Sequence, residues 1–328
     1  MNLVDRRGFL RGAAAWLLAA PRATHAQREG NPRRIGYLSL RRGPGAPDDA
    51  FLQGMRDHGY VEGQNLLVEY RWAAEREDRL PDLARELVSL DVEVLVTSAT
   101  PAVSAATRAT SAIPIVMQSA ADPIGSGFIT NLARPGGNVT GLTLLSGELA
   151  GKRLQLMQEL VPPSARVAVL ALDNAFATPL LLEAMQSAAR QLDVDLVVQL
   201  VANAEDLSKC FMAFKRAGAQ SLIVQQSPFT AGQREKILQL AARHRLPAMY
   251  ESSLFVNAGG LVAYGPDLVQ MFRRSAAFVD KILRGAKAGD LPIEQPTKFE
   301  LIINLKTAKA LGIAIPPSML LRADTVIQ

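Results

Sequence analysis

The segment VLVTSATPAVSAA, residues 94–106, joins a short apolar, β-branched run to a run of small helix-forming residues. The first run predicts a buried β-strand, and Pro101 suits the first turn of a helix that follows it. Ser98 and Thr100 lie at the junction, where Thr100 suits the N-cap of that helix. A strand that runs straight into a helix is half of a βαβ unit, so the segment predicts a parallel sheet.

The same alternation of strand and helix patterns extends through most of the chain. Strands are predicted over 34–40, 65–71, 92–98, 113–119, 138–144, 166–172, 193–201, 220–227 and 246–252. Helices are predicted near 48–58, 78–90, 101–110, 124–132, 152–162, 177–192, 204–217 and 230–244. The strands are almost wholly apolar, as expected where helices cover both faces of a sheet. The fold class predicted is α/β, with two lobes that each contain a doubly wound parallel sheet.

The two lobes are expected to share the chain through several crossings. Joins are predicted near 143–151, 257–265 and 289–296, where strand and helix patterns break. We therefore expect 33–145 plus 260–290 to form lobe 1 and 146–259 plus 291–328 to form lobe 2. Lobes connected in this way can hinge.

The first 26 residues have the features of an export signal. A charged start is followed by the apolar stretch 13–20, and then by Thr24 and Ala26 as small residues before a cleavage point. The apolar stretch is shorter than the roughly 20 residues that span a bilayer. Arg6-Arg7 resembles a twin-arginine signal. We predict a signal peptide over 1–26, cleavage near Ala26, and a mature periplasmic protein without a membrane span; a basic amphipathic helix is the alternative.

Composition excludes several classes of function. The 328 residues are 48% hydrophobic and 20% charged, which is ordinary for a globular protein. The formal charge of +5 falls to about +2 without the leader, so nucleic acid is not an expected partner. Arg41-Arg42 and Arg273-Arg274 are interpreted as solvated charges. One cysteine and three histidines leave little for a disulfide, a metal site or a Ser-His-Asp triad, so no metal and no cofactor is predicted.

Candidate ligand contacts come from the residues that follow each strand, because open parallel sheets bind ligands beyond the carboxyl ends of their strands. Ser98 and Thr100, at the start of a helix, suit a carboxylate. Asp122 or Glu251 could bind an ammonium group, and the two sites together suggest an amino acid. Aromatic residues that could cover its side chain are Phe176, Phe229 and Tyr264. An ordinary helix cap, a turn aspartate and a solvated glutamate are the alternative interpretations.

Motifs for catalysis and nucleotide binding are not found in the sequence. There is no GxSxG, no GxxxxGK[ST] and no GxGxxG directly after the first strand. The acids Asp122 and Glu251 could in principle do acid–base chemistry. Without a histidine or lysine beside them, binding is preferred to catalysis, and the chain is not predicted to be an enzyme.

Three segments resemble the ABC transporter substrate-binding family whose characterised members include tryptophan- and phenylalanine-type binding proteins. They are SAIPIVMQSAADPIGSGFITNLARPGGNVTG (111–141), FVNAGGLVAYGPD (255–267) and KFELIINLKTAKALGIAIPPSMLLRADTVI (298–327). The resemblance implies the type I periplasmic-binding-protein fold, with two lobes, three crossovers and a ligand in the cleft between them. It also implies delivery of the ligand to a membrane permease with its ATPase.

Carried over by position, the resemblance implies a set of ligand-binding residues. They are Ser98, Thr100, Ser119, Asp122, Asn174, Ser227 and Glu251, with Tyr264 at the hinge. The function predicted is a solute-binding component of an ABC importer for an amino acid or related carboxylate, expected to be a monomer. The alternatives are a sensor of the same fold that docks on a signalling receptor, an exported enzyme, and a DNA-binding regulator.

Overall fold

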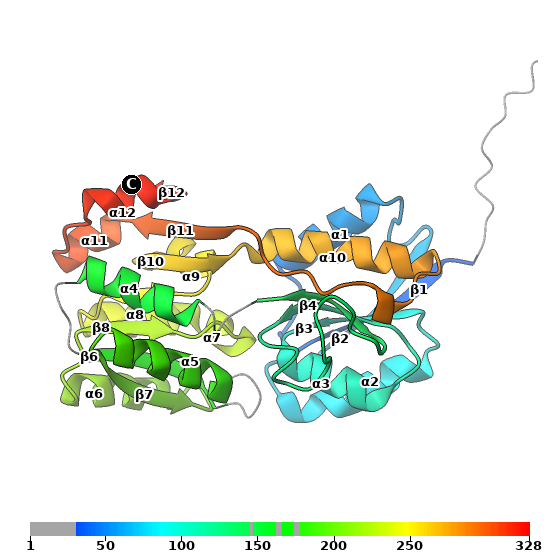
Figure 1. Ribbon diagram of the computed structural model, residues 1–328, viewed down its shortest axis with the longest axis horizontal. Helices are drawn as coiled ribbons and strands as arrows, with labels where there is room; N and C mark the ends of the chain where they lie inside the picture. The colour runs from blue at the N-terminus through cyan, green and yellow to red at the C-terminus, as the bar shows by residue number, and fades with distance from the viewer. Residues whose placement is uncertain (1–30, 145–146, 148, 162–165, 174–177) are drawn as a thin grey trace, which may run out of the picture. The chain divides into compact units, whose positions relative to one another are not determined.

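Two β-sheets organise the computed structural model, which describes residues 31–144, 147, 149–161, 166–173 and 178–328 (Figure 1). Residues 33–328 form one unit. The first sheet has the strand order β2-β1-β3-β4-β5, and every neighbouring pair is parallel. Its strands are β1 (Arg33–Ser39), β2 (Leu66–Trp72), β3 (Val94–Ser98), β4 (Ile115–Ala120) and β5 (Val139–Thr143).

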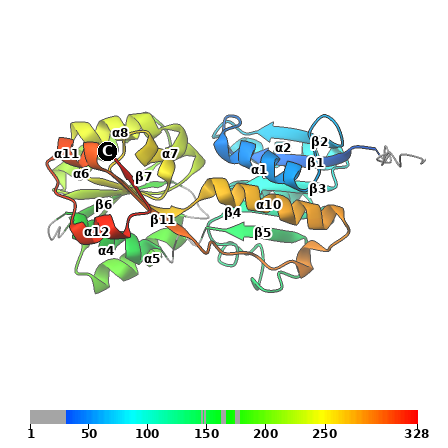
Figure 2. The same ribbon diagram turned by 90° about the horizontal axis from the view of Figure 1, so that it is seen from above.

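Helices cover both faces of the first sheet. Alternate residues of β1 point to opposite faces, so Ile35 and Tyr37 pack with α1 and α10, whereas Leu38 packs with α2 and α3. Figure 2 shows α10 beside α1. The helices are α1 (Ala46–Asp57), η1 (Glu77–Arg79), α2 (Leu80–Ser89), α3 (Thr100–Ala109), α10 (Leu268–Leu283) and the short η2 (Ala288–Asp290).

The second sheet repeats this winding and then extends it. Its order is β12-β11-β10-β9-β8-β6-β7, so β7-β6-β8-β9-β10 corresponds to the order of the first sheet. The pair β10–β11 is antiparallel and the pair β11–β12 is parallel, so β11 and β12 both run against the other five strands. The strands are β6 (Arg166–Leu172), β7 (Asp195–Val201), β8 (Ser221–Val224), β9 (Ala248–Tyr250), β10 (Val262–Pro266), β11 (Phe299–Asn304) and β12 (Thr325–Ile327).

Two apolar clusters pack on the faces of the second sheet. One involves α4, α5, α11 and α12, and the other involves α6, α8 and α9. The helices are α4 (Ala150–Leu160), α5 (Thr178–Gln191), α6 (Leu207–Arg216), α7 (Pro228–Gly232), α8 (Arg234–Arg243), α9 (Ser253–Asn257), α11 (Leu305–Leu311) and α12 (Pro317–Arg322). The α/β class with two parallel-sheet lobes is therefore confirmed, as are the nine predicted strands.

The helix predicted over 124–132 is wrong. The segment after β4 forms turns instead, because Asp122 Oδ1 accepts hydrogen bonds from the N–H groups of Ile124 and Gly125, at 3.1 and 2.9 Å. Gly127 then takes a φ of +75°, outside the helical region. Local side-chain hydrogen bonds and glycine thus override the apolar pattern of the segment.

The second crossing between the sheets lies later than predicted. Strand β10 pairs with β9 and β11 in the second sheet, although the sequence pattern predicts 260–290 in lobe 1. The chain leaves that sheet after Pro266, and α10 packs on the first. Glu294, predicted in lobe 2, bridges to Leu142 of β5. The pattern break near 257–265 marks the turn before β10 and not the crossing itself.

Candidate functional site

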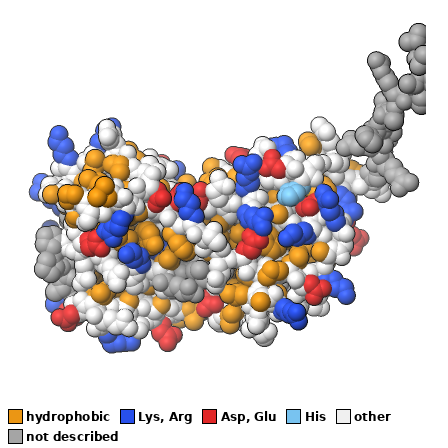
Figure 3. Space-filling view, turned by 45° about the horizontal axis from the view of Figure 1, so that its top comes forward, with side chains coloured by type: hydrophobic (Ala, Val, Ile, Leu, Met, Phe, Trp, Pro, Cys, Tyr) orange, Lys and Arg blue, Asp and Glu red, His pale blue; other side chains and the backbone are white. Residues whose placement is uncertain are grey.

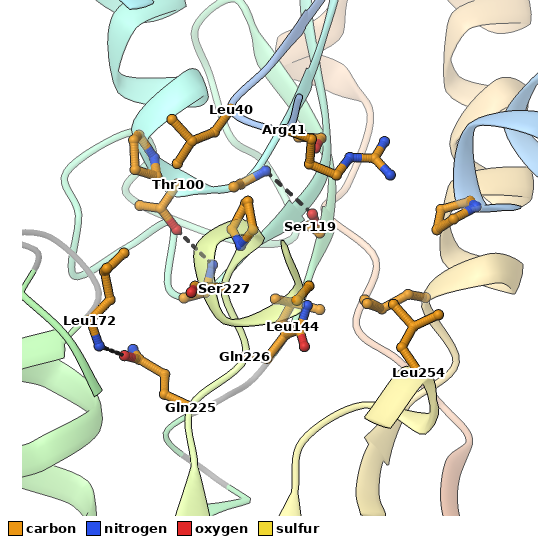
Figure 4. Close-up of a pocket in the computed structure, with 18 of the residues that line it drawn as sticks. Leu40, Arg41, Thr100, Ser119, Leu144, Leu172, Gln225, Gln226, Ser227 and Leu254 are labelled. Carbon is orange, nitrogen blue, oxygen red and sulfur yellow. Dashed lines mark hydrogen bonds between the residues drawn. The ribbon is translucent and has the colours of Figure 1, made fainter. Parts of the chain in front are cut away.

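A cavity with about 940 Å³ of empty space, partly open to solvent, lies where the ends of strands from both sheets meet (Figure 4). Most of its lining is apolar, with a few hydroxyl, amide and charged groups. The first lobe contributes Leu40, Arg41, Pro47, Glu77, Ser98, Ala99, Thr100, Pro101, Ser119, Ala121, Leu144, Leu268 and Phe272. The second contributes Leu172, Thr178, Leu181, Gln225, Gln226, Ser227, Pro228, Ala231 and Leu254. Concave apolar sites with few polar groups are typical of small-molecule binding.

Two reciprocal hydrogen bonds join the segments at the carboxyl ends of β3 and β4. The Ala99 N–H donates to Ser119 Oγ at 3.3 Å, and the Ala121 N–H donates to Thr100 Oγ1 at 3.1 Å, as drawn in Figure 4. Thr100 and Ser119 are both buried. Because each hydroxyl oxygen already accepts a backbone N–H, its own O–H group can donate to a ligand. The two turns therefore form one polar wall that suits an acceptor such as a carboxylate.

The prediction that Thr100 caps its helix is wrong by one residue. Ala99 is the N-cap of α3 and provides no side-chain cap, while Thr100 is the first helical residue and bonds across to the next turn. Ala99 has a φ of +74° and a ψ of 148°, a conformation that favours glycine. Backbone strain of this kind is concentrated at functional sites in proteins. The strained backbone of Ala99 at the cavity wall is therefore independent evidence that the cavity is a functional site.

Asp122 lies in a second cavity next to the first. Ala121 and Leu181 line both cavities, and the second also contains Asp122, Glu183 and Gln295. Asp122 Oδ1 is occupied by the turn described above, whereas Oδ2 makes no hydrogen bond within the described residues. This carboxylate is therefore separated from Thr100 by Ala121, at the boundary between the two cavities.

Glu251 does not line either cavity. Its carboxylate is buried, with Oε1 at 2.8 Å from Arg153 Nη1 and Oε2 accepting the N–H of Gln226 at 3.2 Å. Burial raises the pKa of Glu251, and the Arg153 charge opposes that rise. Burial likewise lowers the pKa of Arg153. Glu251 thus contacts the cavity through the backbone of Gln226.

The other predicted contacts are spread over the second lobe. Ser227 lines the cavity and caps α7, since its Oγ accepts the Thr230 N–H at 3.1 Å. Tyr264 packs against the core of the second lobe, and its carbonyl accepts a hydrogen bond from Arg153 Nε at 3.0 Å. Phe229 is buried in the other apolar cluster of that lobe. Asn174 and Phe176 lie outside the described residues.

Sequence reasoning missed three features of the lining. The sequence predicts a solvated charge at Arg41, yet its side chain is only 20% exposed and lines the cavity. Gln225 follows β8, and its Oε1 accepts the Leu172 N–H at 2.8 Å, so its position after a strand was a usable signal. Phe272 reaches the cavity from the second turn of α10, and no strand-end rule could have found it.

Surface charge, possible metal ligands and helix hydrophobicity in the described residues bear on the kinds of partner that the protein can bind. On the face drawn in Figure 3, basic and acidic side chains are interspersed. Among the described residues, no group of three His, Cys, Asp or Glu side chains could hold a metal ion. No helix in the described part of the chain is long and apolar enough to cross a membrane.

The family model for ABC transporter substrate binding proteins matches residues 46–327. The chain belongs to this family. Members of the ABC transporter substrate binding family bind small solutes, work with an ABC transporter, and are extracellular or periplasmic. The family assignment agrees with the cavity, which both sheets line at their strand ends.

Similar proteins confirm the fold. A tyrosine-binding protein of Clostridioides difficile is 24% identical over 270 residues, which cover 80% of this chain and 75% of that protein. A conserved domain protein of Vibrio cholerae is 27% identical, with a TM-score of 0.85 over 90% of this chain and all of the other. A Streptococcus pneumoniae ABC domain in complex with L-Trp is 23% identical, with a TM-score of 0.82 over the same shares. The family member described here thus has the type I periplasmic-binding-protein fold.

Proposed function

We propose that this family member is the exported solute-binding component of an ABC importer and binds an amino acid or a related small carboxylate. The observation that carries the proposal is the polar wall formed by Thr100 and Ser119, whose hydroxyl oxygens accept backbone N–H groups and leave their O–H groups to donate. An anionic acceptor satisfies such donors in a buried site, where charge-assisted hydrogen bonds are strongest.

The proposed arrangement separates the two charges of an amino acid. The ligand carboxylate lies against Ser98, Thr100 and Ser119, and its ammonium group reaches Asp122 past Ala121. Ser227 supplies a polar contact from the second lobe. Apolar lining residues such as Leu172 and Leu254 surround the ligand side chain. The tyrosine-binding relative and the similar ABC domain in complex with L-Trp support an amino acid with a large, mostly apolar side chain.

Glu251 has a different role in this proposal. Its two oxygens are used by Arg153 and Gln226, so it supports the cavity wall from behind and does not contact the ligand. Tyr264 acts in the same supporting way, through its backbone carbonyl. Asn174 stays a proposed contact from the second lobe.

Binding and not catalysis is the proposed mechanism. A ligand that contacts both lobes binds more tightly where they are close together, and it therefore shifts the population toward a closed form. The closed form is proposed to dock on a permease and its ATPase as a monomer. The twin-arginine leader over 1–26, with cleavage near Ala26, is proposed to deliver the chain to the periplasm.

A thermal-shift screen of the mature chain, starting at Gln27, tests this proposal. The panel contains the twenty amino acids, their amides, benzoate, phenylacetate and 2-oxo acids, with sugars and nucleosides as ligands of other classes. A ligand at 100 times its dissociation constant stabilises the folded state by about 2.7 kcal/mol. We expect stabilisation by at least one amino acid, lost in Asp122→Asn and retained in Asp290→Asn, an exposed acid outside the cavities. A shift with sugars or nucleosides only would contradict the proposed ligand class.

A further inference from the structure

Arg41 is the one basic residue in the lining of the cavity that both sheets form at their strand ends, as far as the described residues show. It lies two residues after the end of β1, between Trp72 of β2 and Phe272 of α10. Its neighbour Arg42 has a side chain that is 70% exposed and pairs with Glu75. The two arginines of this pair therefore have very different surroundings, although the sequence presents them alike.

Four groups hold the Arg41 guanidinium in place. Its Nη2 donates to the Asp48 carboxylate, and its Nε lies 3.4 Å from Ser39 Oγ. The rings of Trp72 and Phe272 lie 5.6 and 5.4 Å from the guanidinium carbon, within the range of cation–π contact. A long side chain fixed in this way has already lost most of its rotamer freedom before a ligand arrives.

A buried network anchors the partner carboxylate in turn. Asp48 is 3% exposed, and its Oδ1 lies 2.5 Å from the Tyr37 hydroxyl, while its Oδ2 accepts the Gly45 N–H at 2.8 Å. Burial and the Asp48 charge raise the pKa of Tyr37, which keeps that hydroxyl protonated as a donor. Asp48 is thereby fixed independently of Arg41.

Hydrogen bonds connect the network around Asp48 with α10, whose Phe272 lines the cavity. The Tyr37 hydroxyl also lies 2.8 Å from Gln118 Oε1, and Gln118 Nε2 donates to Ser275 Oγ at 3.1 Å. Ser275 donates in turn to the carbonyl of Phe272 at 2.6 Å. The ring that covers the guanidinium and the carboxylate that orients it therefore belong to one hydrogen-bonded set.

The Arg41 guanidinium has N–H donors that no group in the described part of the chain accepts. Within the described part of the chain, its Nη1 makes no hydrogen bond, although a guanidinium carries five N–H donors and suits a carboxylate in two-point contact. The hydroxyl that Nε approaches, Ser39 Oγ, is 3.4 Å from Ser98 Oγ. The cation and the hydroxyl wall thus lie at one end of the cavity.

We propose that Arg41 selects a carboxylate on the ligand by donating from Nη1, with Asp48 and Phe272 as the residues that position it. This inference rests on the proposed function and names the group that gives the site its preference for an acid. An aromatic or aliphatic acid is bound through its carboxylate, whereas the corresponding amide or amine lacks the charge that Arg41 requires.

Binding constants for matched ligand pairs test the proposal. Isothermal titration uses L-tryptophan and L-tyrosine, their amides, and the best-binding carboxylate of the screen. Arg41→Gln is expected to weaken carboxylate binding 10- to 100-fold and to leave amide binding within twofold. Arg41→Lys is expected to retain part of the affinity, and Arg42→Gln all of it. Equal affinity of Arg41→Gln and wild type for the carboxylate, or equal loss for carboxylate and amide, would overturn the role of Arg41.

A second variant guards against a folding defect. Arg41→Gln leaves the buried Asp48 without its guanidinium, so the Arg41→Gln/Asp48→Asn double variant removes both charges together. It is expected to melt close to wild type and to show the same selective loss of carboxylate affinity. If it binds the carboxylate as wild type does, the proposal is overturned. If wild type itself binds no carboxylate, the proposed function fails, and the role of Arg41 fails with it.

Discussion

Arg153 and Glu251 form a buried ion pair across 98 residues of sequence, with 2.8 Å between Nη1 and Oε1. Their side chains are 1% and 3% exposed. Arg153 belongs to α4, the first helix after the chain enters the second lobe. It also donates to the carbonyl of Tyr264 in β10, and the chain leaves that lobe two residues later, after Pro266. Glu251 accepts the N–H of Gln226 at the cavity. One charged pair thus connects two crossings with the wall of the site.

Glu251→Gln is expected to destabilise the protein by about 3–5 kcal/mol, because the buried Arg153 charge loses its carboxylate. Urea unfolding of the mature chain measures this loss. The Arg153→Met/Glu251→Met double variant removes both charges and is expected to recover most of the stability. A double variant as unstable as Glu251→Gln would contradict an electrostatic origin and point to packing alone.

Thr100→Val is expected to weaken binding of a carboxylate ligand by about 10-fold or more, since a hydrogen bond to a charged group contributes about 1.5–3 kcal/mol. The change removes one donor and leaves the Ala121 N–H without its acceptor. Thr107→Val is the matched control, because Thr107 lies on the same helix and, within the described residues, its side chain bonds to the Ser104 carbonyl alone. Titration calorimetry should find the control unchanged; equal weakening by both variants would argue against a direct contact of Thr100.

Ala99→Gly is expected to preserve or raise stability, by up to about 1 kcal/mol, because Ala99 has a φ of +74° and glycine adopts that conformation without strain. The opposite is expected for Ala105→Gly in the middle of α3, where glycine costs about 1 kcal/mol. Thermal and urea unfolding of the two variants give the comparison. Equal destabilisation would show that Ala99 is not strained in solution.

Glu294 predicts a pH dependence of stability. Its hydrogen bonds with Arg274, at 2.7 and 2.8 Å, hold the pKa of Glu294 below its ordinary value of 4.5. A carboxylate with a lowered folded-state pKa stabilises the fold above the unfolded pKa, and this contribution is lost as the pH falls through the folded pKa. The urea midpoint of wild type should therefore exceed that of Glu294→Gln near pH 7, and the difference should shrink below about pH 4.5.

Arg274→Gln checks the assignment, since it removes the partner and leaves Glu294 in place. It should reduce the same acid-sensitive part of the stability. A difference between wild type and Glu294→Gln that stays constant from neutral to acid pH would show that the ion pair does not control this titration.

The sheets could be predicted because a continuous apolar, β-branched run, such as β3, is typical of a strand that is buried on both faces. The polar wall was also predictable, since Ser98, Thr100 and Ser119 lie at the carboxyl ends of two neighbouring parallel strands. Glu251 shows where such reasoning ends. A strand-end acid looks the same whether it faces a ligand or an arginine far away in the sequence, and only the packing of α4 decides which.

Arg41 shows the converse limit. Its burial depends on Phe272 and Trp72, which tertiary structure brings to it from α10 and β2. The failed helix over 124–132 has a local cause instead, because Asp122 and two glycines favour turns at a position where apolar spacing alone suggested a helix.

The most direct test of the central claim is a titration of the mature chain with its best-stabilising carboxylate, compared with Ala121→Phe. Ala121 lines both cavities, so a phenyl ring there fills the space proposed for the ligand. We predict saturable one-to-one binding by wild type, and none by a variant whose circular dichroism matches that of wild type. Binding of equal affinity by the variant would place the ligand elsewhere and contradict the account.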